Sequence, residues 1–383
     1  MYNFSFYNPV KIIFGKNTIS KLSKEIPKNS KIMIIYGGGS IKKNGVYQQV
    51  IDALSGIEFV EFAGIEANPH YETCLKCVEK IKAKNVDFLL AVGGGSVIDA
   101  VKFIAAATFF ENDPWKIMNE EANIKKALPF GSILTLPATA SEMNKGAVIT
   151  KAATHEKLAF HSDKVYPKFS ILDPTTTFTL PKIQIANGII DTFVHVTEQY
   201  LTTCENAKIQ DYFAESILKV LIEEGLKVFD DLENYDIRAN LMWASTWGLN
   251  GWIAQGQSED WSTHMIGHEL TAIHGIDHAQ TLAIILPGVM EIMKNDKKEK
   301  IIQMGKNVFG IIEKDDETFI KKTISAVDNF FQSLGIATHL SDYNVPDETI
   351  EIIVKRLKDR NWILGEKQNI TPEVVKEILK IRK

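Results

Sequence analysis

Short apolar runs alternate with amphipathic segments through the first half of the chain. The runs KIMIIYGGG (31–39), IEFVEFAGI (57–65) and VDFLLAVGGGS (86–96) are typical of buried strands that end in tight turns. Segments of helical period follow, such as VYQQVIDALSG (46–56) and VIDAVKFIAAATFF (97–110). This repetition predicts a parallel sheet covered by helices on both faces, with ligands bound at the carboxyl ends of its strands.

The pattern changes after residue 182. FGSILTLPATASE (130–142) adds another strand and turn, and Pro174 and Pro181 then interrupt the chain. Nearly everything after Lys182 has a helical period. We therefore predict an α/β domain over residues 1–182 and an all-α domain over residues 183–383.

Composition and charge exclude several classes of partner. The net charge of −5 provides no basic excess for nucleic acid or an anionic membrane surface. Asp99 and Lys102 interrupt the longest apolar stretch, so we expect no membrane span. The first residues lack a basic segment followed by an apolar one, and the chain has 3 cysteines, an odd number. Both features favour a cytoplasmic protein without disulfides.

Cys74 and Cys77 form a C-x-x-C motif, which can indicate a redox or zinc site. The period of YETCLKCVEKIKAKNV (71–86) places both cysteines on one helical stripe with Val78 and Ile81. A redox motif would open a helix directly after a strand, and a zinc site would need a second Cys or His pair nearby. Neither condition is met, so we predict two ordinary core thiols.

Histidines are concentrated in two apolar segments of the second half, GIIDTFVHVTEQY and WSTHMIGHELTAIHGIDHAQTLAIILP. They are His195, His264, His268, His274 and His278. Asp191 and His195 are four residues apart, as are His264 and His268, so each pair shares one helix face. A lone histidine on an apolar helix is usually a core residue, but two in-phase pairs favour a metal site. A carboxylate with three imidazoles suits Fe, Zn, Ni or Co.

Two GGGS turns follow predicted strands, at residues 37–40 and 93–96. Neither completes the G-x-G-x-x-G fingerprint of many dinucleotide-binding proteins. In the second turn, Ser96 is expected to cap the next helix while Asp99 completes an S-x-x-D capping box. Its glycines would let backbone amides approach a pyrophosphate at the helix N-terminus.

The first GGGS turn bears on the choice of dinucleotide. Enzymes that prefer NAD often place an acid after an early strand to bind the ribose hydroxyls. The stretch from Tyr36 to Gly45 contains no acid, but it contains Ser40, Lys42 and Lys43. Unless both lysines are merely solvated surface charges, they favour NADP(H) over NAD(H).

The chain resembles the iron-containing (group III) alcohol dehydrogenases, in particular the NADPH-dependent aldehyde reductase and butanol dehydrogenase branch. The resemblance rests on the two histidine-bearing motifs and on FSFYNPVKIIFGK, GIEANPHYET, AVGGGSVIDAVKFIA, LTLPATASEMNKGAVIT, LDPTTTFTLP and THLSDYNV. It implies a Rossmann-like dinucleotide-binding domain and a helical metal-binding domain, the dehydroquinate synthase-like architecture. It also implies a homodimer.

The resemblance assigns roles to particular residues. It implies one divalent metal, Fe(II) or Zn(II), with Asp191, His195, His264 and His278 as ligands. His268 would lie beside the metal without ligating it, and the role of His274 stays open. The implied cofactor contacts are Gly37, Gly38, Ser40, Asn68, Gly95, Ser96, Asp99, Thr135, Thr139, Val148 and Lys157.

The expected reaction is the interconversion of short- to medium-chain primary alcohols and aldehydes, butanal included. The metal would polarise the carbonyl, the nicotinamide would supply hydride, and His268 is the candidate proton relay. Phe160, Trp252, Trp261 and Met265 could form an apolar substrate pocket, although such residues are more often packing.

Two alternatives remain at the level of sequence. The first is a metal- and NAD-dependent lyase of the dehydroquinate synthase type. Its relatives use a carboxylate and two histidines in a basic site, whereas the surroundings here are apolar and acidic. The second is a non-catalytic metal- or nucleotide-binding protein, which would leave the cofactor-type turns unexplained.

Overall fold

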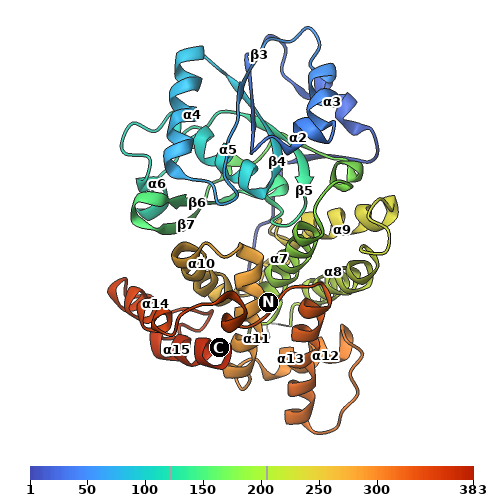
Figure 1. Cartoon of the computed structure of the whole chain (residues 1–383), viewed down its shortest axis with the longest axis vertical. Helices are drawn as coiled ribbons and strands as arrows, with labels where there is room; N and C mark the ends of the chain where they lie inside the picture. Colours follow the sequence, from blue (N-terminus) through green and yellow to red (C-terminus); the bar gives the residue numbers. More distant parts are fainter. Residues whose placement is uncertain (121, 204–205) are drawn as a thin grey trace. The chain divides into compact units, whose positions relative to one another are not determined.

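The computed structural model describes residues 1–120, 122–203 and 206–383, which divide into two compact units (Figure 1). The α/β unit comprises Tyr7–Leu180 and Asp231–Thr246. The helical unit comprises Met1–Phe6, Pro181–Asp230 and Trp247–Lys383.

This division is more interleaved than a single boundary at residue 182. The first residues join the helical unit, where Tyr2 N donates to Gly256 O at 2.8 Å and Phe6 contacts the Trp252 ring. The first part of α9 (Tyr235–Gly248) joins the α/β unit because its Met242 side chain lies in the apolar core there.

The α/β unit contains a six-stranded, fully parallel sheet in the order β1-β8-β5-β4-β2-β3. Its strands are β1 Lys11–Phe14, β2 Ile32–Tyr36, β3 Phe59–Phe62, β4 Phe88–Gly94, β5 Phe130–Leu136 and β8 Phe169–Leu172. All residues of β2 and nearly all of β4 are buried, which explains their continuous apolar sequences. The predicted parallel sheet is confirmed.

Helices cover both faces of this sheet. Met33 and Ile35 of β2 pack in a core that includes α4 and α5, whereas Ile32 and Ile34 belong to a second core that includes α3. The helical elements of the unit, besides α9, are η1 Thr18–Lys21, α1 Leu22–Glu25, α2 Ser40–Lys43, α3 Val46–Ala53, α4 Tyr71–Lys84, α5 Gly95–Ala107, α6 Lys116–Asn119, η2 Ser141–Met143, η3 Ala152–Thr154, η4 Asp163–Val165 and η5 Pro174–Thr177.

Two features of the α/β unit were not predicted from the sequence. An antiparallel hairpin of β6 (Gly146–Lys151) and β7 (Glu156–His161) forms a separate two-stranded sheet. Strand β8 is only four residues long and lies between β1 and β5. Short strands of this kind carry too few residues for a clear apolar period.

The predicted capping box at the second GGGS turn is wrong. Helix α5 begins at Gly95 with Gly94 as its N-cap, so Ser96 is already inside the helix. The Ser96 hydroxyl donates to Ala67 O, and the Asp99 carboxylate accepts bonds from groups outside the helix. The helix therefore starts earlier than the S-x-x-D pattern implies, which leaves both side chains free for tertiary contacts.

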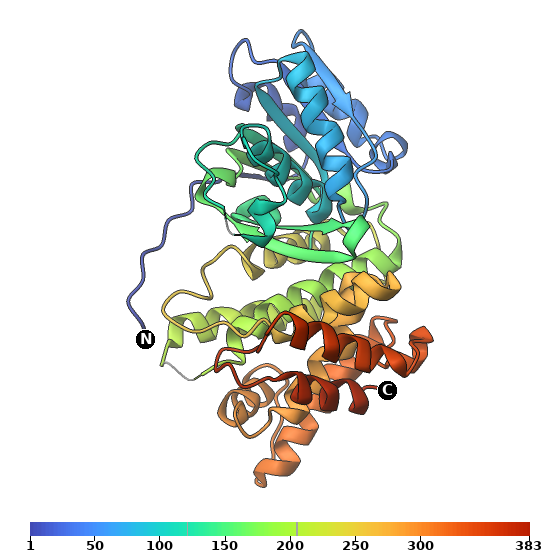
Figure 2. The same cartoon turned by 90° about the vertical axis from the view of Figure 1, so that its left-hand side faces the viewer.

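The described part of the helical unit is built from helices, as predicted (Figure 2). They are α7 Lys182–Tyr200, α8 Lys208–Lys227, α10 Ser262–His274, α11 His278–Ile292, α12 Lys298–Asn307, α13 Asp316–Ser333, η6 Leu340–Tyr343, α14 Glu348–Asp359 and α15 Pro372–Ile381. Every residue of α7 from Ile185 to Tyr200 is buried. Helix α11 packs against α7, α10, α13 and α15, so α7 and α11 form the interior of this unit.

The C-x-x-C cysteines are core residues, as predicted. Cys74 and Cys77 are reduced and fully buried on α4, and burial raises the pKa of Cys74 well above its usual value and that of Cys77 to about 12. Cys204 lies outside the described residues. Among the described residues, no helix combines the length and apolarity needed to cross a membrane.

Candidate metal centre and cofactor-binding edge

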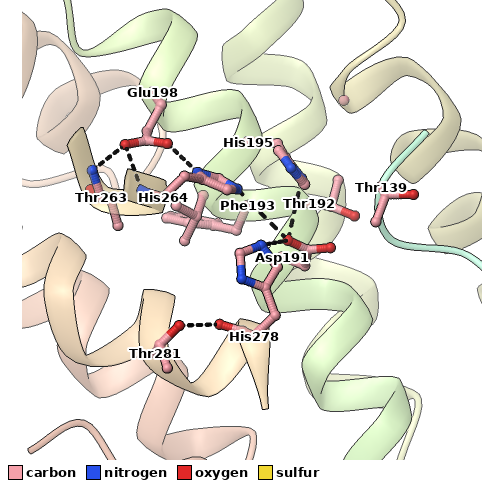
Figure 3. Close-up of polar contacts among 12 residues, drawn as sticks. Thr139, Asp191, Thr192, Phe193, His195, Glu198, Thr263, His264, His278 and Thr281 are labelled. Carbon is pink, nitrogen blue, oxygen red and sulfur yellow. Dashed lines mark hydrogen bonds and ion pairs between the residues drawn. The ribbon is translucent and has the colours of Figure 1, made fainter. Parts of the chain in front are cut away.

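Two helices bring a carboxylate and two imidazoles together inside the helical unit. Asp191 and His195 lie one turn apart on α7, and His195 Nδ1 is 3.4 Å from Asp191 Oδ1 (Figure 3). His264, near the start of α10, places Nε2 at 4.0 Å from the same oxygen. One ligand atom of each residue lies within 4.8 Å of the others, and all three residues are buried.

His278 completes the set of four predicted ligands. It is the first residue of α11, and its Nε2 is 3.7 Å from Asp191 Oδ1. Its ring centroid is 5.2 Å from that of His264, and its side chain is 22% exposed. The structure therefore brings all four residues together, with the more accessible one at the N-terminus of α11.

The chemistry of these atoms fits a divalent metal. Within the described part of the chain, the buried atoms Asp191 Oδ1 and His195 Nδ1 make no hydrogen bond, which is costly unless another group satisfies them. Burial lowers the pKa of His195 to about 4, so its imidazole is neutral, the form that binds metals. A set of one carboxylate and three neutral imidazoles accepts both Fe(II) and Zn(II).

Glu198 orients the His264 ring, a role that the sequence analysis missed. Its carboxylate is hydrogen-bonded to His264 Nδ1, which leaves Nε2 directed toward Asp191 (Figure 3). Glu198 Oε1 also accepts from the backbone N–H of Thr263 (2.5 Å) and of His264 (3.3 Å). Carboxylates in this position fix the tautomer and orientation of metal-binding histidines.

Burial, together with the nearby carboxylate of Asp260, raises the pKa of Glu198 to about 8. The sequence did contain a signal for Glu198, since Asp191, His195 and Glu198 follow the i, i+4, i+7 spacing of one helix face.

A buried ion-pair cluster fixes the start of α10. Asp260 accepts from Ser262 N at 2.8 Å and pairs with Lys297 Nζ at 2.8 Å, and Lys297 also pairs with Glu366 at 3.1 Å. The intervening Trp261 has φ of 63°, a left-handed conformation that is unusual for a large residue. Its ring centroid lies 5.2 Å from that of His264, beside the metal-binding residues.

The two remaining histidines of α10 have different surroundings. The ring centroid of His268 is 5.1 Å from that of His278 and 6.2 Å from that of His264, and His268 is buried. His274 is hydrogen-bonded through Nε2 to Thr349 Oγ1 of α14 at 2.9 Å. His268 therefore lies beside the four clustered residues, whereas His274 links two helices.

Of the four residues proposed for an apolar substrate pocket, Trp261 alone is placed against the clustered histidines by a ring contact in the described structure. Phe160 lies in the core of the α/β unit and packs edge-on against Phe103. Trp252 packs against Phe6, and Met265 packs against an apolar core of the helical unit. The expectation for Phe160 is wrong because a β7 side chain that points inward fills the core.

Predicted cofactor residues gather at one edge of the parallel sheet. Gly37 and Gly38 follow β2, Gly95 and Ser96 open α5 after β4, and Thr135 and Thr139 lie at or after the end of β5. Because the carboxyl ends of parallel strands meet at the same edge, these turns are neighbours. A Cβ at Gly95 would be 2.4 Å from Thr139 Oγ1, so the turns at α5 and after β5 touch.

Asp99 ties the hairpin to this edge. Its carboxylate accepts from Ser141 Oγ at 2.5 Å and from Val148 N at 2.9 Å. Burial raises the pKa of Asp99, an effect that the nearby Lys102 opposes. Lys157 of β7 and Asn68 are two further predicted cofactor contacts. They bond to each other, since Lys157 Nζ donates to Asn68 Oδ1 at 3.1 Å.

The first GGGS turn borders an open hollow of about 340 Å³. The hollow is lined by Tyr36, Gly37, Gly38, Gly39, Lys42, Ala63 and Gly64. Ser40 is the first residue of the short helix α2 and is exposed. The stretch from Tyr36 to Gly45 contains no acid, but Glu61 of β3 reaches Tyr36 and Lys42 from the neighbouring strand.

Comparison with known proteins shows similarity along the whole chain. Residues 9–174 match the family model described as iron-containing alcohol dehydrogenase, and residues 185–382 match that of the C-terminal part of the Fe-containing alcohol dehydrogenase family. The chain is 51% identical over 382 residues to the NADPH-dependent aldehyde reductase YqhD of Escherichia coli, which covers 99% of both chains. It is 40% identical over 386 residues to the NADH-dependent butanol dehydrogenase A of Clostridium acetobutylicum, again covering 99% of both chains.

Solved structures show the same likeness in three dimensions. A crystal structure of E. coli YqhD has a TM-score of 0.98 at 49% identity, covering 100% of this chain and 99% of that chain. The NADH-dependent butanol dehydrogenase A of Thermotoga maritima has a TM-score of 0.94 at 38% identity, with the same coverage.

Proposed function

The chain belongs to the iron-containing alcohol dehydrogenase family, and from this premise we propose that it reduces short- to medium-chain aldehydes with NADPH. Family membership makes it an oxidoreductase of the alcohol dehydrogenase and aldehyde reductase type, which requires a metal and a nicotinamide cofactor. The preference for NADP(H), the identity of the metal and the individual site residues are parts of the proposal.

The observation that carries the proposal is the cluster of Asp191, His195, His264 and His278 around one carboxylate oxygen. These four residues would hold one Fe(II) or Zn(II) ion. A metal bound there supplies a Lewis acid for the oxygen of an aldehyde. Glu198 keeps the Nε2 atom of His264 available for this role.

His268 is the proposed proton relay for the substrate oxygen. Its ring is buried next to His278, and an imidazole has a proton affinity suited to transfer near neutral pH. The Trp261 ring lies beside His195 and His264 and presents an apolar surface next to them. The position of this ring suits an aldehyde with an apolar chain, butanal included.

The sheet edge of the α/β unit is the proposed cofactor site. A nicotinamide dinucleotide supplies the hydride. The amides at the start of α5 favour an anion such as its pyrophosphate, because this helix is 13 residues long and its N-terminus points to the sheet edge. Asn68, Asp99, Val148 and Lys157 would fix the walls of the site through the bonds described above.

NADP(H) is the proposed dinucleotide because the hollow beside the first GGGS turn provides space and is lined by one lysine, Lys42. Relatives of both kinds exist, since YqhD is NADPH-dependent and the butanol dehydrogenase A of C. acetobutylicum is NADH-dependent. Further parts of the proposal are a cytoplasmic homodimer, a dinucleotide-binding domain over residues 1–182 and a metal-binding domain over residues 183–383.

The proposal is tested by following the oxidation of NADPH and of NADH with butanal, using purified protein of known metal content. We expect rapid NADPH oxidation that requires butanal, with a lower kcat/KM for NADH. A folded, metal-loaded protein without turnover on butanal or its homologues would contradict the proposed substrate class and favour the lyase alternative.

A further inference from the structure

A carboxylate with three hydrogen-bond donors stands beside the glycine-lined hollow. Glu61 of β3 accepts from Tyr47 OH at 2.5 Å through Oε1 and from Tyr36 OH at 2.7 Å through Oε2. Lys42 Nζ approaches the same Oε2 at 3.3 Å. Although burial raises the pKa of Glu61, the bonds from Tyr47, Tyr36 and Lys42 hold it below its usual value.

Lys42 is held in place without being buried. Its ammonium lies 5.1 Å from the ring centroid of Tyr36 and 4.5 Å from that of Tyr47, which are cation–π distances. The Lys42 side chain is 47% exposed and lines the hollow together with Gly37, Gly38 and Gly39. A positive charge is thus fixed at the rim of an open hollow of the proposed cofactor site.

Glu61 is poorly placed to select NAD(H). An acid that selects NAD(H) accepts bonds from the hydroxyls of the ribose. Both oxygens of Glu61 already accept hydrogen bonds: Oε1 from Tyr47, and Oε2 from Tyr36 and Lys42. The carboxylate is therefore engaged with these side chains and is not available to the hydroxyls of a ribose. Glu61 therefore serves as an anchor for Lys42.

Building on the proposed aldehyde reductase function, we propose that Lys42 is the residue that selects the 2′-phosphate of NADP(H). A phosphate carries about two negative charges, so it competes well with the single, long contact between Lys42 and Glu61. When Lys42 turns to the phosphate, Glu61 keeps the hydrogen bonds from Tyr36 and Tyr47. Releasing the lysine therefore leaves the half-exposed Glu61 carboxylate with two hydrogen-bond donors.

The neighbouring Lys43 provides a matched control. It carries the same charge, is exposed, and is not among the residues that line the hollow. We expect Lys42→Met to raise the KM for NADPH by about 10- to 100-fold, as for a lost charged hydrogen bond. The kcat with NADPH and the kcat/KM for NADH should change little, and Lys43→Met should leave all of these values close to those of the parent.

A second variant tests the role of the two phenols. Tyr47→Phe removes one donor from Glu61 but no charge, so Glu61 should hold Lys42 more firmly. We expect a KM for NADPH that rises several-fold, with the NADH kinetics unchanged. The Tyr47 ring packs against the hydrophobic core that includes α3. Because phenylalanine keeps this ring, the variant should fold normally.

Calorimetry of 2′,5′-ADP and 5′-AMP binding tests the NADP(H) preference of the protein separately from the role of Lys42 in it. If the parent binds both nucleotides equally, NADP(H) preference is wrong and the role of Lys42 fails with it. If the parent prefers 2′,5′-ADP and Lys42→Met keeps that preference, the role of Lys42 is wrong while the proposed function stands. Loss of the preference in Lys42→Met, but not in Lys43→Met, is the expected result.

Discussion

Asp191 is the residue on which the candidate metal centre is built. Ring nitrogens of His195, His264 and His278 lie 3.4, 4.0 and 3.7 Å from its Oδ1 atom. These separations suit atoms that share one ion. The buried carboxylate oxygen would otherwise stay unsatisfied, which is why a cation is the natural partner of this cluster.

Glu198→Gln should weaken metal binding without removing a ligand. The amide cannot accept as strongly from His264 and the two backbone amides, so the imidazole loses basicity and orientation. The expected loss of affinity for Zn(II) is about 10- to 100-fold, measured by competition with a chelator. Glu215→Gln is the control, since Glu215 is equally buried on α8 but bonds to Tyr200, Gln303 and Asn307. Equal affinities in all three proteins would exclude a positioning role for Glu198.

His268→Ala tests the proton relay. Loss of a general acid lowers turnover by about 100-fold or more, while the bound metal should remain at one ion per chain. The measurement is kcat with butanal at saturating NADPH, together with the metal content of the same sample. A kcat equal to that of the parent would end the relay hypothesis.

At the scale of elements, the features that could be predicted from the sequence are those that depend on the local spacing of apolar and polar residues. Asp191 and His195 share a face of α7 because they are four residues apart, and the parallel sheet follows from alternating strands and helices. The contact between Glu198 and His264 spans 66 residues, so no local pattern reveals it. The anchoring of Lys42 by Glu61 depends in the same way on the pairing of β2 with β3.

The start of α5 shows how closely the cofactor edge is packed. A Cβ added at Gly95 would lie 2.4 Å from Thr139 Oγ1, whereas one at Gly38 would meet nothing within 4 Å. Gly95→Ala should therefore lower the free energy of unfolding by about 1–3 kcal/mol, the usual cost of overpacking. Gly38→Ala should leave it nearly unchanged. Chemical denaturation of both variants checks this, and equal stabilities would show that the turn after β5 adapts without cost.

At the scale of the whole molecule, the predicted ligands come from one unit and the predicted cofactor contacts from the other. α7, α10 and α11 supply all four ligands, and α2, α5, β5 and the hairpin are among the elements that carry the cofactor contacts. All predicted cofactor contacts precede all predicted metal ligands along the chain, so sequence analysis could assign cofactor binding and metal binding to different domains. The interleaving of residues 1–6 and 231–246 could not be predicted, because it depends on long-range packing.

Metal binding should stabilise the folded protein because the ligands join three helices. At a free metal concentration of about 1,000 times Kd, the gain is about 4 kcal/mol. Thermal unfolding of chelated protein with and without Zn(II) measures this gain as a rise in the midpoint. Asp191→Asn should abolish the rise, and a rise of equal size in that variant would place the stabilising metal elsewhere.

The most direct test of the account is a titration of metal-free protein with Fe(II) and, separately, with Zn(II), followed by NADPH oxidation with butanal. The account predicts negligible activity without metal and a linear rise that ends at one ion per chain for at least one of the metals. His195→Ala should stay inactive throughout. Full activity in the metal-free protein, or in that variant, would contradict the central claim that these four residues hold the catalytic metal.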